Sequence, residues 1–344
     1  MRVIVTGSSG FVGRWVMEGL ARDGIEAIGL DISPPSRPHA SHPFIECSIL
    51  DQEGLSRAFQ DARPDVLIHL AARTDLDEKH DLAGYDVNIG GVRNVLAAAR
   101  ASKIRRAIFT STQLVCRVGH VPSGECDYCP DTLYGQSKVV SEGLVREASR
   151  EIPEWCIVRP TTVWGPGMST HYQMMLRLIA RGRYFHCGSG ALRKSYIYSE
   201  NIANQYSALI KAPTHLIQGR VFYLADHEPM SLRFYADELA RAMGVPKIRT
   251  MPLSLARIVA KIGDLGLQFG IRNVPFTSFR LRNILTEYIF DTSPIVSISG
   301  NGPVTQLEGI RRTARWFLDL HPEFRPTDSQ HKRTGQSNGL QPRD

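Results

Sequence analysis

The sequence predicts an α/β protein built on a doubly wound parallel sheet of the Rossmann type, followed by a smaller, mainly helical subdomain. In the first half of the chain, short runs of β-branched residues alternate with amphipathic stretches, and these runs are continuously apolar rather than alternating. Strands that helices cover on both faces show this pattern, which is typical of a parallel sheet. After about residue 166 the alternation gives way to helical segments joined by Pro and Gly.

The elements follow from these patterns in chain order. Strands are expected at 2–7, 26–31, 43–49, 65–72, 106–112, 155–163 and 220–226. Helices of the second half are expected at 171–182, 231–244, 253–271 and 304–320. We therefore expect a nucleotide-binding domain over 1–166 with a returning segment near 192–226, a substrate-binding subdomain over 167–324, and a disordered tail over 325–344.

Composition limits the possible partners. The 344 residues are 42% hydrophobic and 22% charged, and the formal charge of +7 is spread without a basic block, which argues against nucleic acid. The N-terminus enters a strand without the features of a signal peptide, so a cytoplasmic protein is expected. Three charged residues interrupt 253–271, and we predict an amphipathic helix that faces a core there rather than a membrane span.

The six cysteines are expected to be free thiols, as in a cytoplasmic protein. Cys126 and Cys129 form a CxxC pair, but a zinc site would need two more ligands. Only His120 lies nearby in sequence, so no metal site is predicted.

The first strand runs into a glycine-rich turn. Gly7, Gly10 and Gly13 have the spacing GxxGxxG, and a helix begins near Phe11. Such glycines permit a tight turn and a close approach of the backbone to a pyrophosphate, and the helix N-terminus offers free N–H groups to phosphates. The second strand ends in Asp31, a carboxylate that can bind both ribose hydroxyls and would repel a 2′-phosphate. NAD is therefore favoured over NADP.

Six motifs occur in order along the chain: TGSSGFVG (6–13), IHLAAR (68–73), VNIGGVRNVL (87–96), FTSTQLVC (109–116), YGQSK (134–138) and RPTTVWGPG (159–167). Together they resemble the extended short-chain dehydrogenase/reductases, in particular the NAD-dependent nucleotide-sugar epimerase/dehydratase branch. The resemblance extends from residue 2 to about 320. It implies that the cofactor contacts Gly7, Ser9, Gly10, Phe11, Val12, Gly13, Asp31, Ser48, Ile49, Leu70, Ala71, Ala72, Asn88, Thr110, Tyr134, Lys138 and Pro160.

The same resemblance implies a catalytic triad of Thr112, Tyr134 and Lys138. Tyr134 and Lys138 are one helical turn apart and share a face. A cation ~4 Å from the phenolate is worth roughly 4 kcal/mol at an effective dielectric constant near ~20. Lys138 and bound NAD⁺ are therefore expected to lower the pKa of Tyr134 from ~10 to near ~7, where it can act as general acid and base. Thr112 would hold the reacting hydroxyl or ketone.

On the substrate side, the chain departs from the family pattern. Ser48 stands where an Asp usually contacts adenine, and Thr162 stands in place of an Asn. Gln113 and Leu114 occupy the positions of the acid/base pair of a dehydratase, and Leu114 also that of the cysteine of a 3,5-epimerase, so both reactions are disfavoured. The residues expected to contact substrate are Thr112, Gln113, Thr162, His171, Arg193, Lys194 and Arg282.

The expected reaction is NAD-dependent epimerisation at C4 of a nucleotide-activated hexose, through a transient 4-keto intermediate, as part of polysaccharide biosynthesis. An NAD(P)H-dependent reductase of a 4-keto nucleotide sugar is the alternative, because the triad is the same. A dinucleotide-binding regulator without catalysis is a third reading. The resemblance also implies a homodimer formed by helices at about 85–101 and 134–150.

Overall fold

The structure is a computed structural model, and it describes residues 1–35, 42–78, 80–148, 151–188, 190, 192–271, 274 and 276–325. A seven-stranded parallel sheet forms its centre, in the order β11-β6-β5-β4-β1-β2-β3. These strands are β1 (Arg2–Thr6), β2 (Glu26–Asp31), β3 (Phe44–Glu46), β4 (Val66–His69), β5 (Arg106–Thr110), β6 (Glu154–Pro160) and β11 (Val221–Leu224). The predicted fold class is confirmed.

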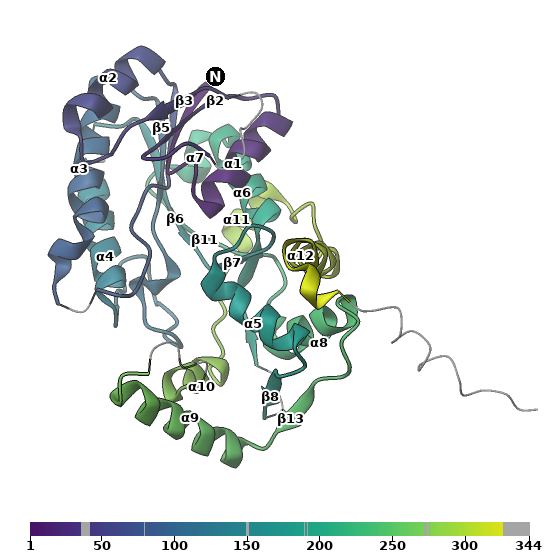
Figure 1. Ribbon diagram of the computed structural model, residues 1–344. Coiled ribbons are helices and arrows are strands. Elements are labelled where there is room, and N and C mark those ends of the chain that lie inside the picture. Colours follow the sequence, from purple (N-terminus) through teal and green to yellow (C-terminus); the bar gives the residue numbers. More distant parts are fainter. Residues whose placement is uncertain are drawn as a thin grey trace, which may run out of the picture.

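Helices cover both faces of this sheet (Figure 1). One face carries α1 (Phe11–Arg22), α6 (Ser199–Lys211), α7 (Thr214–Ile217) and α11 (Ser293–Ser299); the other carries α2 (Gln52–Ala62), α3 (Asp86–Ala101) and α4 (Leu133–Glu147). Alternate residues of β1 enter the two cores: Val3 and Val5 pack on the α1 side and Ile4 on the α3 side, all fully buried. Burial on both faces is why the strands read as continuously apolar.

The order of the strands reverses at β1, which lies between β2 and β4. The chain passes from β1 outward to β2 and β3, then returns to β4 on the other side of β1. In open α/β sheets, ligands bind beyond the carboxyl ends of the strands at such a reversal. The glycine turn after β1 and the residues after β4 therefore lie at the expected binding edge.

The second half of the chain forms three short two-stranded sheets and a set of helices. β7 (Thr162–Trp164) pairs with β10 (Tyr196–Tyr198), β9 (Arg193–Lys194) with β12 (Met230–Ser231), and β8 (Phe185–Cys187) with β13 (Arg249–Met251). The helices are α5 (Thr170–Ala180), α8 (Leu232–Ala242), α9 (Leu253–Gln268), α10 (Ser278–Ile284) and α12 (Gln306–Leu320). The expected tail from 326 onward lies outside the described residues.

The predicted strand at 155–163 is two strands, β6 and β7, separated at Thr161. The hydroxyl and the N–H of Thr161 both bond to the carbonyl oxygen of Leu224, so β7 leaves the large sheet and pairs with β10.

The prediction that helix 253–271 faces a core holds for its small residues and for Leu253, which pack in a small core cluster with Leu281. It is wrong for most of its large side chains, because Leu255, Ile258, Ile262, Leu265 and Leu267 are exposed. Among the helices of the described chain, none is both long and apolar enough to cross a membrane.

Candidate active site

The glycine turn after β1 brings two backbone segments into close contact. Gly7 has a φ of +74°, which side-chain-bearing residues rarely adopt. A Cβ at Gly7 would lie 2.6 Å from the nitrogen of Ala71, and a Cβ at Gly13 would lie 2.1 Å from the carbonyl oxygen of Gly7. Any larger residue would push the turn away from β4 or from α1, so both glycines are needed for the shape of this edge.

The N-terminus of α1 can receive an anion. Its N-cap residue, Gly10, has no side chain to bond the free N–H groups of the first turn. Across the turn, the carboxylate of Asp31 accepts from the N–H of Ser9 (3.0 Å) and of Ile32 (2.7 Å), which fixes its position at the end of β2. A diphosphate at the helix and a ribose at Asp31 fit this arrangement, so these residues could hold NAD.

Asn88 connects the loop after β4 to the catalytic helix. Its side chain accepts from the N–H of Arg73 (2.8 Å) and donates to the Arg73 carbonyl (3.0 Å) and to the hydroxyl of Ser137 (2.9 Å). Asn88 is fully buried. The polar atoms of its side chain therefore bind protein, and they fix the backbone of Arg73, which directly follows Leu70, Ala71 and Ala72.

Two expected adenine-side residues have structural roles in the protein. Ile49 is buried in the core against α3, and a Cβ at Gly91 would lie 2.5 Å from its Cδ1. The Ser48 hydroxyl accepts from the N–H of Leu50 (3.2 Å). Val12 packs against the core in α1, and Pro160 ends β6.

The three expected catalytic residues meet at the carboxyl end of β5. Thr112 lies two residues beyond β5, and its hydroxyl is close enough to the phenol of Tyr134, in the first turn of α4, to lower the pKa of that phenol. Lys138 follows one turn later and donates from Nζ to the carbonyl oxygen of Thr110 (2.8 Å). Tyr134 and Lys138 are 7% and 3% exposed, so both functional groups lie in a water-poor environment.

Burial opposes the ionisation of Tyr134 in the protein without cofactor. It raises the pKa of this phenol above its ordinary value, and the Thr112 hydroxyl offsets only part of the rise. Burial also lowers the pKa of Lys138 to about 8, against an opposing effect of Glu142. In the protein without cofactor, Lys138 is thus itself desolvated and donates to the carbonyl oxygen of Thr110. The expectation that Lys138 and bound NAD⁺ together bring the pKa of Tyr134 near neutrality stays a prediction.

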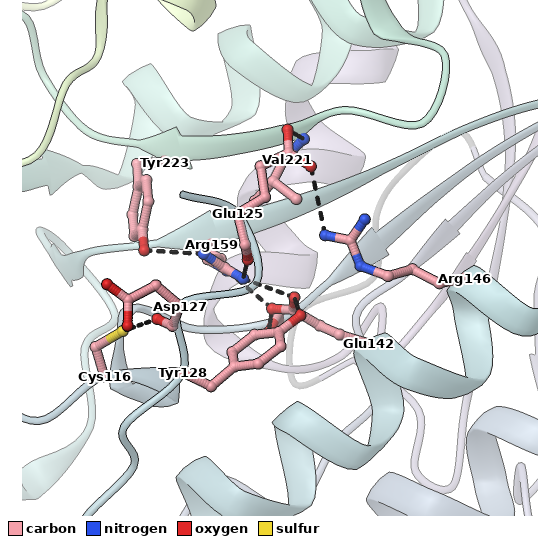
Figure 2. A network of polar contacts seen from close by, with 10 residues as sticks. Cys116, Glu125, Asp127, Tyr128, Glu142, Arg146, Arg159, Val221 and Tyr223 are labelled. Atoms are coloured by element: carbon pink, nitrogen blue, oxygen red, sulfur yellow. Dashed lines mark hydrogen bonds and ion pairs between the residues drawn. The ribbon is translucent and has the colours of Figure 1, made fainter. Parts of the chain in front are cut away.

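A buried ion pair joins α4, the helix that carries Tyr134 and Lys138, to β6 (Figure 2). Glu142, one turn beyond Lys138, binds Nε of Arg159 at 2.9 Å and Nη2 at 2.8 Å, and the two side chains are 2% and 0% exposed. The Glu142 carboxylate also accepts from the hydroxyls of Ser111 (2.5 Å) and Tyr128 (2.7 Å). The pair thereby ties α4, β6 and the residue before Thr112 together.

His69 is a second group that the sequence analysis did not single out. Its Nδ1 lies 2.7 Å from the hydroxyl of Thr6, and its buried Nε2 has no partner among the described residues. Burial, with a smaller effect of Lys138, lowers the pKa of His69 to about 3. A neutral imidazole therefore binds Thr6, the residue before the glycine turn, within the electrostatic influence of Lys138. The sequence feature that could have identified His69 is its position in the continuous apolar strand β4.

The expected substrate residues form one connected group and several separate ones. Gln113 Nε2 donates to the hydroxyl of Thr162 (3.2 Å), so these two lie together beside Thr112. Lys194 is bound to the carbonyl of Asn283 in α10, and burial lowers its pKa to about 8. Arg193 and Arg282 are exposed on β9 and α10. His171 lies in the first turn of α5, and its side chain is outside the described structure.

Cys116, His120 and Cys129 form a cluster whose ligand atoms all lie within 4.8 Å of one another. The predicted CxxC pair is not the basis of this cluster, because Cys126 is exposed and does not take part. Cys116 joins it through an isolated parallel bridge to Cys129.

The glycine turn, the carboxylate of Asp31 at the end of β2 and the buried Thr–Tyr–Lys group are the features of a Rossmann-fold protein of the short-chain dehydrogenase type. A model of the NAD dependent epimerase/dehydratase family matches residues 3–225. The chain belongs to this family, and the family's cofactor is the one expected from the glycine turn and Asp31.

Relatives of known activity are distant but span the chain. The N-acetyl-alpha-D-glucosaminyl-diphospho-ditrans,octacis-undecaprenol 4-epimerase of Escherichia coli O157:H7 is 26% identical over 325 residues, which cover 91% of this chain and 94% of that protein. The 2-alkyl-3-oxoalkanoate reductase of Stenotrophomonas maltophilia is 26% identical over 329 residues, covering 91% and 98%. Both epimerases and reductases are thus among the similar proteins.

Solved structures share the fold. A UDP-glucose 4-epimerase of Thermotoga maritima with UDP-glucose superposes with a TM-score of 0.71 at 21% identity, covering 93% of this chain and 99% of that one. A UDP-glucuronic acid 4-epimerase of Bacillus cereus in complex with NAD has a TM-score of 0.72 at 19% identity, covering 93% and 100%.

Proposed function

We propose that this protein is an NAD-dependent enzyme that epimerises C4 of a nucleotide-activated hexose through a transient 4-keto intermediate. The observation that carries the proposal is the buried contact between the Thr112 and Tyr134 hydroxyls, with Lys138 one turn away, at the sheet edge that carries the glycine turn. Side chains able to move a proton are absent at 113 and 114, where Gln and Leu stand. Redox chemistry at a carbinol is what this set of residues can perform without a further acid/base group.

The protein residues act on the substrate hydroxyl. NAD, when bound, supplies the acceptor for the hydrogen that leaves C4 with its electron pair. Thr112 holds the 4-hydroxyl against Tyr134, which removes its proton and returns it when the opposite face of the ketone has been reduced. Lys138 stabilises the phenolate, because a buried tyrosinate without a nearby cation is costly. Burial raises the pKa of Tyr134, so this cationic partner is essential at neutral pH.

The rival within the same chemistry is a reductase of a 4-keto nucleotide sugar. A different substrate class is also supported: a sugar carried on a lipid diphosphate, as in the name of the Escherichia coli relative. The exposed apolar residues of α9 favour the lipid-linked sugar as substrate, since such a substrate has to be reached at a bilayer. We further propose a cytoplasmic homodimer that serves polysaccharide biosynthesis.

The test begins with the cofactor released from purified protein, identified by mass spectrometry. The protein is then incubated with UDP-, GDP- and dTDP-hexoses and with a polyprenyl-diphospho-hexose, and anomeric proton signals are followed. A new epimer without added cofactor supports the epimerase. A strict requirement for added NAD(P)H would replace it with the reductase, and the absence of any turnover would favour the non-catalytic binder.

Tyr134→Phe is the decisive variant. We expect the rate to fall by roughly 10² to 10⁴-fold with NAD binding retained, because only the transferable proton is removed. Tyr128→Phe is the matched control, since it removes a phenol that binds Glu142 rather than Thr112. Unchanged turnover in the Tyr134 variant would show that the triad assignment is wrong.

A further inference from the structure

The outward face of α9 is apolar. The inward face consists of Ala256, Ala260 and Gly263, and a Cβ at Gly263 would lie 1.9 Å from the carbonyl oxygen of Phe276, so the helix packs closely through its small residues. The large residues are on the other side. Five of those on α9 and directly after it are Leu255, Ile258, Ile262, Leu265 and Phe269, which are 46%, 56%, 62%, 51% and 84% exposed. Leu267 of α9 is also 50% exposed but does not share their spacing.

These five residues recur at intervals of three and four, so they form a single stripe opposite the buried residues. Ile271 (59%) and Phe279 (55%) are also exposed at the end of α9 and in α10. Figure 1 shows α9 along the outer edge of the substrate subdomain, far from the large sheet. Single exposed apolar residues are ordinary, but a contiguous set of this kind marks an interaction surface.

Basic residues border the stripe. Arg257 and Lys261 lie one turn apart on α9 and are exposed. Over 247–271 the sequence holds four basic residues and a single acid, Asp264. The Asp264 carboxylate accepts from the N–H of Ser278 (3.0 Å) at the start of α10. A helix with an apolar face bordered by Lys and Arg has the character of an interfacial helix on anionic lipid.

We propose that α9, with the residues up to Ile271, docks this protein on the surface of an anionic bilayer, with the helix in the plane of the interface. A second copy of the chain is the competing occupant, but the one carboxylate on α9, that of Asp264, is already bound to the N–H of Ser278. The docking face adjoins the substrate side of the site, because α10 packs on α9 and its Asn283 carbonyl binds Lys194. Docking would therefore bring Lys194, an expected substrate residue, near the lipid surface.

The experiment is flotation of the full-length protein with vesicles. We expect binding to vesicles of phosphatidylglycerol and phosphatidylethanolamine, weakened at least tenfold by Ile258→Ser with Ile262→Ser. Arg257→Gln with Lys261→Gln should lower binding and its salt dependence. Leu307→Ser with Leu320→Ser is the matched control, since these apolar residues of α12 are 41% and 53% exposed on another part of the molecule, and it should float like the parent.

Two results would overturn the docking proposal. One is a parent protein that stays unbound with every vesicle composition. The other is a parent dimer in sedimentation that becomes monomeric in the double serine variant while vesicle binding is unchanged, which would assign the face to a second copy. Because binding is measured without substrate, a failed epimerase assay leaves this test intact.

A second, independent observation concerns Cys116, His120 and Cys129. Tetrahedral zinc with Zn–S near ~2.3 Å and Zn–N near ~2.0 Å separates its ligand atoms by roughly 3.5–3.8 Å. The cluster, within 4.8 Å, would close around the ion after shifts of about 1 Å. Cys116 Sγ, which donates to the Asp127 carbonyl at 3.1 Å, would give up that bond.

His120 has the second contact that is usual for a metal ligand. Its Nε2 lies 3.1 Å from Oδ2 of Asp127, and the same oxygen accepts from the N–H (2.8 Å) and the hydroxyl (3.0 Å) of Ser123. Metal-bound imidazoles typically donate their other N–H to a carboxylate of this kind. Nδ1 is then the atom that would bind the ion.

We infer a zinc site formed by Cys116, His120 and Cys129, with water in the fourth position. It would brace the segment between Thr112 and Tyr134. This inference does not depend on the reaction that the enzyme catalyses.

The test uses full-length protein treated with chelator and then loaded with Zn²⁺ or Co²⁺. We expect one metal ion per chain and a Co²⁺–thiolate absorption band, both lost in Cys129→Ser and weakened at least tenfold in His120→Ala, which changes a surface side chain. Cys126→Ser, the exposed member of the CxxC pair, should bind like the parent. Equal loss in Cys126→Ser, absence of the band, or a Cys116–Cys129 disulfide in freshly reduced protein would overturn the site.

Discussion

Replacing Glu142 by Gln tests the buried ion pair on α4, the helix that carries the proposed catalytic residues Tyr134 and Lys138. The carboxylate accepts four hydrogen bonds, from Ser111, Tyr128 and two nitrogens of Arg159. Gln retains the shape but offers one acceptor oxygen, turns an NH₂ group toward donors, and leaves the guanidinium buried without a counter-charge. Breaking such a pair from one side costs about 3–5 kcal/mol, a large part of a total stability of roughly 5–15 kcal/mol.

Urea unfolding followed by circular dichroism measures this loss. Glu151→Gln is the control. Glu151 forms an ion pair with Arg100, and their side chains are 45% and 55% exposed, so the pair should contribute about 0.2–1 kcal/mol. Equal shifts of the unfolding midpoint in the two variants would refute the reasoning, since they would mean that burial does not distinguish the pairs.

The same variant has an effect at Lys138. Glu142 raises the pKa of the lysine, against the larger lowering by burial. Removing the carboxylate should therefore lower that pKa below about 8. The limb of the pH–rate profile that reports Lys138 would move to lower pH. A profile that stays in place would show that the two groups are not electrostatically coupled.

Three further predictions address the cofactor edge and the buried lysine. Gly7→Ala should abolish measurable NAD binding in calorimetry, because the added Cβ would lie 2.6 Å from the nitrogen of Ala71. Retained NAD affinity would contradict the proposal that this glycine turn binds the cofactor. Asp31→Asn should improve NADP affinity relative to NAD by at least about tenfold, because the repulsion between the carboxylate and the 2′-phosphate is removed. An unchanged affinity ratio would show that Asp31 does not contact the ribose. Burial lowers the pKa of Lys138 to about 8, so between about pH 8 and 10 the unfolded chain binds more protons and stability rises with pH. Lys138→Met should reduce this increase of stability with pH, measured by urea unfolding at several pH values. An equal increase in the variant would contradict the lowered pKa of Lys138.

Local sequence was sufficient for the parts of the site that depend on short-range geometry. Gly7, Gly10 and Gly13 lie in one turn, and their requirement for close backbone contact can be read from their spacing. Tyr134 and Lys138 are one helical turn apart, so any helix through them places them on one face. The alternation of buried strands with amphipathic helices likewise predicted the parallel sheet.

Other features depend on residues that are distant in the chain. The partner of Glu142 is Arg159, on β6, and nothing in the spacing of the two indicates the pair. The orientation of α9 was mispredicted because apolar periodicity does not say which side of a helix a neighbour covers; the close approach to Phe276 selected the small residues.

The sequence by itself therefore determined the fold class, the cofactor edge and the chemistry-bearing side chains, because these follow from strand burial, glycine turns and helical periodicity. Only the tertiary structure decided the electrostatic state of Tyr134 and Lys138, the pairing of Cys116 with His120 and Cys129, and the outward face of α9. Each of these depends on which atoms exclude water from a group, and that is a property of packing between distant segments.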